Sequence, residues 1–504
     1  MYWARHHNCI MSRAITCRCS MAIMRYNWQA GSLDCCLYSK INWRAPSPRG
    51  RATLQRLKGN LLMINKQRAK VIFDLAMPVT VGLSSSFIMA LVDLAMVGSL
   101  GTATVAAVGV AGFAYALICA LLAGVTPAVQ SIVSRRMGEN SSDPKCLPLN
   151  AGLLLALAGS IPLALACYFG IESAFSLVSS DPEVIRIGVP YLKILVIGIP
   201  IVGLADAFHG FWAGVGRTRI YMLNVLFVNA LNALLCYVFI FGHVGVEPMG
   251  AKGAGLATTL SVFAGMIFYA VMTRIHYSKN EGLLTARPSA ALLKRMLQIG
   301  IPAVFQSALF ALGYLVFYWI VGHMGTAELA VTNVLNRISI MMNLFAQALG
   351  MTAITLVSRT LGEGNPEAAE EWGWDIAKIG VIWITLLSAP LFLFPDYCLS
   401  IFLHDPATRA MGILPARMTG VCLGIASLIY VFASTLISLG DGKRVMIVSF
   451  STQWLMFLPG VWVVGVFMQG GLVAITLVQL AYGALATVLL TSFWRDGRWK
   501  HIAI

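Results

Sequence analysis

The chain has 504 residues, of which 58% are hydrophobic and only 11% are charged. That charged fraction is about half the usual level in a soluble domain. The mean hydropathy of +0.78 excludes a chain whose whole surface faces water, and with it a soluble enzyme, a disordered protein and a small disulfide-linked secreted domain. The formal net charge of +15 would by itself suggest nucleic acid or anionic lipid as a partner.

Most of the positive charge lies in the first seventy residues, which hold 13 of the 36 Lys and Arg residues and one acid, Asp34. This segment has neither the apolar core of a signal peptide nor the Cys and His spacing of a zinc site. We interpret residues 1–67 as a basic, disordered extension, and Met63 as an alternative start site. The rest of the chain is nearly neutral, so we expect no nucleic-acid partner.

Twelve apolar segments follow, each long enough to cross about 30 Å of hydrocarbon as a helix. The first six are 72–97, 104–132, 148–171, 187–213, 221–242 and 253–275. The second six are 297–321, 329–357, 376–402, 410–438, 445–467 and 470–493. The pattern predicts an all-α membrane protein with an N-terminal lobe at 68–277, a linker at 278–294, a C-terminal lobe at 295–494 and a tail at 495–504.

The connections predict the orientation, because Lys and Arg accumulate in cytoplasmic loops. With a cytoplasmic N-terminus, the inner connections and the tail carry seventeen basic residues, whereas the outer loops carry only Arg186, Lys252 and Arg409. We therefore expect both termini in the cytoplasm and, for a bacterial protein, a location in the inner membrane.

The sequence repeats itself after a shift of 224 residues. Val97-Gly98-x-x-Gly101-Thr102-Ala103 matches Val321-Gly322-x-x-Gly325-Thr326-Ala327, and Pro78, Asp181-Pro182, Lys193, Gly216 and Met222 match Pro302, Asp405-Pro406, Arg417, Gly440 and Met446. Fifteen of the 62 pairs from residue 78 to 139 are identical, against roughly five expected by chance. Two six-helix bundles with the same orientation and a parallel repeat are typical of secondary transporters.

No Walker A motif and no catalytic motif is present, so we expect a transporter coupled to an ion gradient and not an enzyme. Such coupling needs an ionisable group inside the membrane. Asp93 and Asp206 are the two acids well inside predicted spans. His209 lies three residues after Asp206, on the same helix face. This pair is interpreted either as a coupling group or as a structural contact between helices. The second half has in-span polar residues but no central acid: Gln306, Asn333, Asn336, Arg337, Asn343, Gln347 and Gln453.

Several motifs resemble the multidrug and toxic compound extrusion (MATE) family over about residues 68–493: Pro78, Asp93 with Val97-Gly98-x-Leu100-Gly101, Arg135-x-x-Gly138-Glu139, Asp181-Pro182-Glu183, Gly214-x-Gly216-Arg217-Thr218 and the Gly250–Thr258 stretch. The resemblance implies V-shaped lobes. Because Gln306 stands where the NorM branch carries an acid, the chain looks closer to the branch of the DNA-damage-inducible protein DinF. In that branch coupling lies in the N-terminal lobe.

The resemblance also implies a proton- or sodium-linked network. Asp93, Tyr191, Asn232 and Thr258 match its residues in the first, fourth, fifth and sixth helices, and Pro78 matches the helix-1 hinge. Two positions depart from the pattern, since Cys236 replaces a second Asp and His209 replaces an Asn. We hypothesise that His209, with Asp206, supplies the missing titrating group. Protons are favoured over sodium because a lone carboxylate binds a cation weakly.

The predicted function is an antiporter that exports amphipathic or cationic drugs or toxic compounds in exchange for protons or sodium by alternating access. We expect a monomer with a small organic substrate, contacts with membrane lipid, no metal site and no cofactor besides the transported ion. Two alternatives stay open. One is a flippase for lipid-linked oligosaccharides, which the scarcity of basic in-span residues disfavours, and the other is a non-transport scaffold in a damage response.

Overall fold

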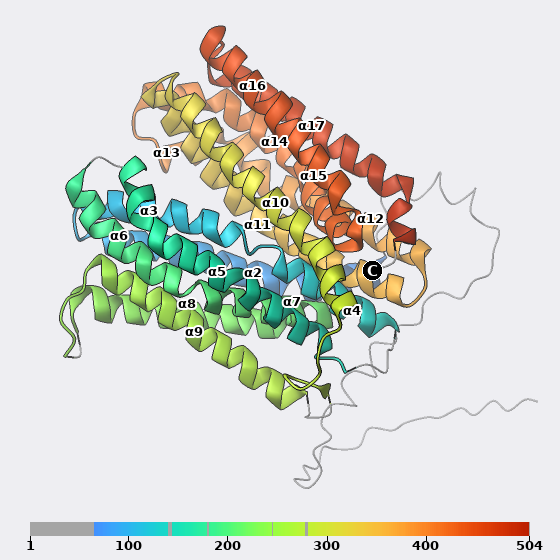
Figure 1. The fold of residues 1–504 in the computed structure, drawn as a ribbon. Coiled ribbons are helices and arrows are strands. Elements are labelled where there is room, and N and C mark those ends of the chain that lie inside the picture. Colours follow the sequence, from blue (N-terminus) through green and yellow to red (C-terminus); the bar gives the residue numbers. More distant parts are fainter. Residues whose placement is uncertain (1–64, 140–143, 179–180, 244, 278–280, 503–504) are drawn as a thin grey trace, which may run out of the picture. The chain divides into compact units, whose positions relative to one another are not determined.

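The computed structural model describes residues 65–139, 144–178, 181–243, 245–277 and 281–502 (Figure 1). All of the regular secondary structure in these ranges is helical. The start site considered at Met63, and the predicted N-terminal extension up to residue 64, lie outside the described residues.

The described residues of the N-terminal half form eight helices (Figure 1). They are α2 (Lys66–Gly98), α3 (Thr102–Ala120), α4 (Val125–Glu139), α5 (Leu147–Val178), α6 (Pro182–Ile197), α7 (Ile199–Val215), α8 (Thr218–Phe241) and α9 (Ala251–His276).

The C-terminal half begins at α10 (Ala290–Gly322), inside the segment assigned above to the linker. It continues with α11 (Thr326–Gly362), α12 (Pro366–Leu393), α13 (Pro395–Ser400), α14 (Pro406–Leu436), η3 (Ile437–Asp441), α15 (Gly442–Phe450), η4 (Ser451–Phe457), α16 (Leu458–Val461), η5 (Trp462–Phe467), α17 (Gly471–Asp496) and η6 (Arg498–His501).

These helices agree with a twelve-span architecture. Ten helical runs are long and apolar enough to cross a membrane, and the bent pair α6 and α7 makes an eleventh. The longest run, Pro406–Phe467, has 62 residues, and Gly440 interrupts it with a φ of 86°. Dividing the run at this residue gives twelve spans.

Two predicted spans are not straight helices. The span predicted at 104–132 is divided into α3 and α4. Gly124 lies at this division because the backbone of Gly300 on α10 approaches closely, and a Cβ at Gly124 would lie 2.3 Å from the Gly300 carbonyl oxygen. The span predicted at 187–213 bends by 46° between α6 and α7.

The repeat found in the sequence is also a repeat of local geometry. Gly216, which ends α7, has a φ of 84°, close to the 86° of Gly440. Only glycine adopts this left-handed conformation readily. Asp181 and Asp405 each cap a helix that begins with proline, accepting backbone N–H bonds from Glu183 and Thr408. Hydrogen bonds from the Thr408 hydroxyl and backbone N–H hold the pKa of Asp405 below its ordinary value.

The two halves meet along α4 and α11, which pack closely together. A Cβ at Gly138 would lie 2.0 Å from the Arg359 carbonyl oxygen, and a Cβ at Gly362 would lie 2.1 Å from the Arg135 carbonyl oxygen. These two contacts are the same contact repeated 224 residues later. A pseudo-two-fold axis therefore passes between the ends of α4 and α11.

Polar side chains reinforce this interface. Gln130 donates from Nε2 to the Met351 carbonyl oxygen at 2.7 Å and to Thr355 Oγ1 at 2.8 Å. Ser131 Oγ donates to the Ser438 carbonyl oxygen at 2.6 Å and lies 3.3 Å from Ser358 Oγ. Because these groups are buried, their hydrogen bonds are needed to offset desolvation, and they fix how the two halves meet.

Asn150, a buried residue of α5, anchors the connection between the halves. Its Nδ2 donates to the carbonyl oxygens of Gly282 and Ala286 at 2.7 and 2.9 Å, and its Oδ1 accepts from the Leu284 backbone N–H at 3.0 Å. The first part of the linker is therefore attached to the N-terminal half.

Candidate functional site

The candidate coupling site is centred on Asp93, in the last third of α2. The Cys236 thiol of α8 donates to Asp93 Oδ1 over 3.5 Å, which is within the range of sulfur hydrogen bonds. Cys236 is fully buried, whereas Asp93 is half-buried. The thiol therefore contacts the carboxylate from the inner side of the lobe.

Asn232 lies one helical turn before Cys236 and is also buried. With its amide nitrogen oriented toward α2, it donates to Asp93 Oδ1 at 3.2 Å, and its oxygen accepts from the Thr258 hydroxyl at 3.3 Å. With the opposite orientation, its nitrogen donates to Thr258 Oγ1 and to Ser261 Oγ, both at 3.3 Å. The first orientation gives both the nitrogen and the oxygen of the amide suitable partners, so the Asn232 side chain connects Asp93 to Thr258.

Tyr191 of α6 completes this cluster. Its ring lies over Gly255 of α9, where a Cβ would come within 3.1 Å of it. Its hydroxyl is close enough to interact electrostatically with both Asp93 and Cys236. The structure therefore brings together five of the residues predicted from the sequence, from α2, α6, α8 and α9: Asp93, Tyr191, Asn232, Cys236 and Thr258.

Asp206 and His209 of α7 lie apart from this cluster. The His209 ring stacks on Tyr221 with ring centroids 4.0 Å apart, and its buried Nε2 has no hydrogen-bond partner in the part of the chain that the structure describes. The backbone carbonyl of Asp206 accepts from the Thr126 hydroxyl at 3.1 Å. Across the described ranges, no hydrogen bond or ion pair joins Asp206 or His209 to Asp93, or to each other.

Tyr115 of α3 lies near both acids' surroundings. Its hydroxyl is close to the Cys119 thiol, to Tyr191 of the Asp93 cluster and to Asp206. Tyr115 and Tyr191 therefore lie in the region between Asp93 and Asp206. Sequence reasoning missed Tyr115, because its span carries no motif and its role depends on which helices pack around α3.

Pro78 lies inside α2, and Pro302 occupies the equivalent place in α10. Proline lacks a backbone N–H, so it removes one hydrogen bond from the helix and weakens it against bending. Asp93 follows Pro78 on the same helix, and a bend at Pro78 would therefore move the carboxylate.

The chemistry of the Asp93 cluster is that of one carboxylate among neutral thiol, amide and hydroxyl groups. It can bind and release one proton inside the membrane. Among the described residues, no three or more His, Cys, Asp or Glu side chains are grouped to hold a metal ion. The arrangement contains neither a nucleophile paired with a base nor a cofactor-binding motif.

The MatE family model matches residues 78–238 and 302–463, one match in each half. The two matches begin 224 residues apart, as the internal repeat requires. The chain belongs to the MATE family. Its members are membrane transporters, and the chain is therefore a transporter and not an enzyme.

Similar curated proteins agree with this MATE assignment. The chain is 27% identical over 319 residues to the probable multidrug resistance protein NorM of Thermotoga maritima, covering 62% of this chain and 68% of that protein. It is 25% identical over 449 residues to the protein of the same name from Pseudomonas putida, covering 86% of this chain and 95% of that protein.

The fold agrees with solved MATE structures. One, described as an outward-facing conformation of a multidrug resistance MATE family transporter, has a TM-score of 0.77 and 21% identity, covering 86% of this chain and 97% of that one. Another, a transporter from Pyrococcus furiosus whose binding pocket is described as having reverse polarity, has a TM-score of 0.76 and 22% identity, covering 85% and 95%. At such identities the likeness shows the fold alone.

Ser261 is a second residue beside the Asp93 cluster that the sequence reasoning missed. It lies three residues after Thr258, on the same face of α9, and is buried against Asn232. The helical spacing of the two hydroxyls could have indicated it, because residues three apart share a face.

Proposed function

We propose that the chain exports amphipathic and cationic drugs or toxic compounds in exchange for protons. Family membership supports multidrug efflux, and the Asp93 cluster carries the proposal for coupling. It holds one carboxylate with neutral partners, which is suited to binding a proton. A sodium ion prefers several oxygen ligands with more negative charge, and the thiol of Cys236 is a poor substitute for a carboxylate.

In this proposal the N-terminal lobe couples transport, as in the DinF-like branch. Protonation of Asp93 removes its charge and changes its hydrogen bonds with Asn232 and Cys236. The change is transmitted along α2, which bends at Pro78. Asp206 and His209 act as a second titrating site, connected to Asp93 through Tyr115 and Tyr191.

The proposed cycle is alternating access in the bacterial inner membrane with both termini in the cytoplasm. The contact of α4 with α11 lies where the basic residues Arg135 and Arg359 predict the cytoplasmic side. Its close packing supports a state that is closed toward the cytoplasm, and transport requires this contact to open and reform.

The test is ethidium efflux from cells or inverted vesicles, energised separately by a pH gradient and by a sodium gradient. Asp93→Asn should abolish efflux driven by the pH gradient. Asp74→Asn is the matched control, because Asp74 is an exposed acid on the same helix, and it should transport normally.

Efflux by Asp93→Asn at the wild-type rate would refute the coupling role. If efflux persists after the pH gradient is collapsed but requires sodium, the coupling ion is sodium and not the proton. His209→Asn tests the second site separately, since an unchanged pH dependence of transport would remove His209 from the mechanism.

A further inference from the structure

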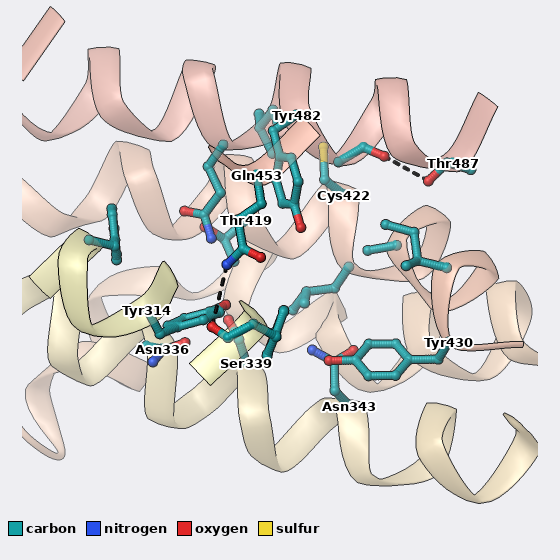
Figure 2. Close-up of a pocket in the computed structure, with 18 of the residues that line it drawn as sticks. Tyr314, Asn336, Ser339, Asn343, Thr419, Cys422, Tyr430, Gln453, Tyr482 and Thr487 are labelled. Atoms are coloured by element: carbon teal, nitrogen blue, oxygen red, sulfur yellow. Dashed lines mark hydrogen bonds between the residues drawn. The ribbon is translucent and has the colours of Figure 1, made fainter. Parts of the chain in front are cut away.

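The C-terminal lobe contains a cavity of about 410 Å³ between α10, α11, α14, η4 and α17 (Figure 2). Pockets for drug-sized organic molecules fall in this range of volumes. Two of the lining residues, Phe310 and Ile425, are 44% and 51% exposed.

The described residues that line this cavity include no Asp, Glu, Lys, Arg or His. Three tyrosines from different helices, Tyr314, Tyr430 and Tyr482, line it, and their hydroxyls lie close enough to interact electrostatically (Figure 2). A cation buried here would lose hydration without gaining a carboxylate partner. The lining therefore favours an uncharged aromatic compound over a permanent cation.

Asn343 of α11 is one of several hydrogen-bonding residues that line the cavity. Its Oδ1 is buried and has no hydrogen-bond partner among the described residues, and a turn of the side chain would present it to the cavity. Other amides that line the cavity donate within the protein: Gln306 Nε2 to Ser449 Oγ at 3.2 Å, and Gln453 Nε2 to the Phe310 carbonyl oxygen at 3.4 Å. Because an unsatisfied buried acceptor is unfavourable, the Asn343 oxygen is suited to an N–H or O–H group of a bound molecule.

We propose that this cavity binds uncharged, aromatic, amphipathic compounds that carry an N–H or O–H donor, with the tyrosines around the ring system and Asn343 accepting the donor. The proposal rests on the transport function above and assigns the uncharged aromatic members of its substrates to this cavity. It also places substrate and proton in different lobes. Protonation of Asp93 then does not displace the substrate by competition, and coupling passes through movement of the lobes.

Three acridine derivatives that share one ring system separate the contribution of the N–H donor to binding from that of the positive charge. Acridone is uncharged and has an N–H donor, N-methylacridone is uncharged without the donor, and N-methylacridinium is a permanent cation. Their fluorescence reports binding to the purified full-length protein in detergent. Acridone should bind at least about tenfold more tightly than N-methylacridinium, since the lining offers a buried cation no counter-charge.

Two pairs of variants locate the site. Asn343→Leu should weaken acridone binding about tenfold, as expected for the loss of one buried hydrogen bond, and should leave N-methylacridone within about twofold. Its control is Gln347→Leu, an exposed position one turn further along α11. Ala426→Phe, which fills the cavity from α14, should weaken both uncharged probes, whereas Ala481→Phe at an exposed position of α17 outside the lining should not.

Equal affinity for acridone and N-methylacridinium would overturn the proposed selectivity. Unchanged acridone binding in Ala426→Phe would place the site elsewhere, and equal weakening of acridone and N-methylacridone in Asn343→Leu would make Asn343 a structural residue. Asp93→Asn should bind acridone like the wild type, and weaker binding in this variant would refute the separation of the two sites. If acridone binds as expected but no pH gradient drives efflux in the wild type, the transport proposal fails while the cavity assignment stands.

Discussion

The glycine pair between α4 and α11 gives a direct test of how the two lobes close. Replacing Gly138 or Gly362 by alanine would place a methyl group 2.0 or 2.1 Å from a carbonyl oxygen of the other half. An ordinary contact of this type is about 3.4 Å, so the helices would have to separate by about 1.3 Å. The obstacle is backbone in each case and cannot rotate aside.

Overpacking of this kind costs about 1–3 kcal/mol. Separation of the lobes relieves the overlap, so the penalty falls on the closed arrangement described here and not on a state in which the helices have parted. Each substitution should then raise the ratio of parted to closed molecules by about 5- to 150-fold. The double variant should shift the ratio by less than the product, because one separation relieves both overlaps.

The assay is maleimide labelling of Ser358→Cys, since Ser358 is fully buried in this interface. Labelling should accelerate in Gly138→Ala and Gly362→Ala by similar factors. Gly109→Ala is the control, because Gly109 is an exposed helical glycine with open space around its Cβ position. Wild-type labelling rates in both interface variants would refute the argument that this contact closes the lobes.

Three further predictions concern single residues. Cys236→Asp should confer sodium-stimulated efflux, because a second carboxylate beside Asp93 strengthens an oxygen site for a cation, and efflux unchanged by sodium would contradict this. Asn150→Leu should destabilise the protein by about 2–4 kcal/mol in thermal unfolding, since three buried hydrogen bonds are lost, and an unchanged midpoint would show that water replaces them. Burial raises the pKa of Cys146 to about 12, so only about one thiol in 10⁴ is ionised at pH 8. Maleimide should therefore label Cys146 far more slowly than Cys398, with a rate that increases with pH, and equal rates at the two sites would contradict it.

The internal repeat is the part of the fold that the sequence predicts best. The 224-residue shift identifies Gly216 with Gly440 and Asp181 with Asp405, and the structure gives each pair the same backbone role. Hydrophobic periodicity indicates which residues are removed from water, but not which helices pack against each other. The close contact of Gly138 with the Arg359 carbonyl therefore could not be derived from it, although residues 135–139 and 359–363 are related by the same 224-residue shift.

The candidate site, too, could be predicted only in part from the sequence. The resemblance to the family identifies Asp93, Asn232 and Thr258, because these residues match those of the family's coupling network. Tyr115 and the cavity around Asn343 do not follow from any motif. Their functions depend on side chains from several helices converging in space, and in the sequence these residues appear only as isolated polar groups in apolar segments.

The anchoring of the linker by Asn150 limits how the halves can move. Asn150 of α5 holds Gly282 and Ala286, and α10 begins at Ala290. Residues 287–289 are therefore the only part of the linker between the anchored segment and α10. Three extended residues reach about 10 Å. In the proposed cycle, the C-terminal lobe can therefore pivot about this point but cannot slide far along the other lobe.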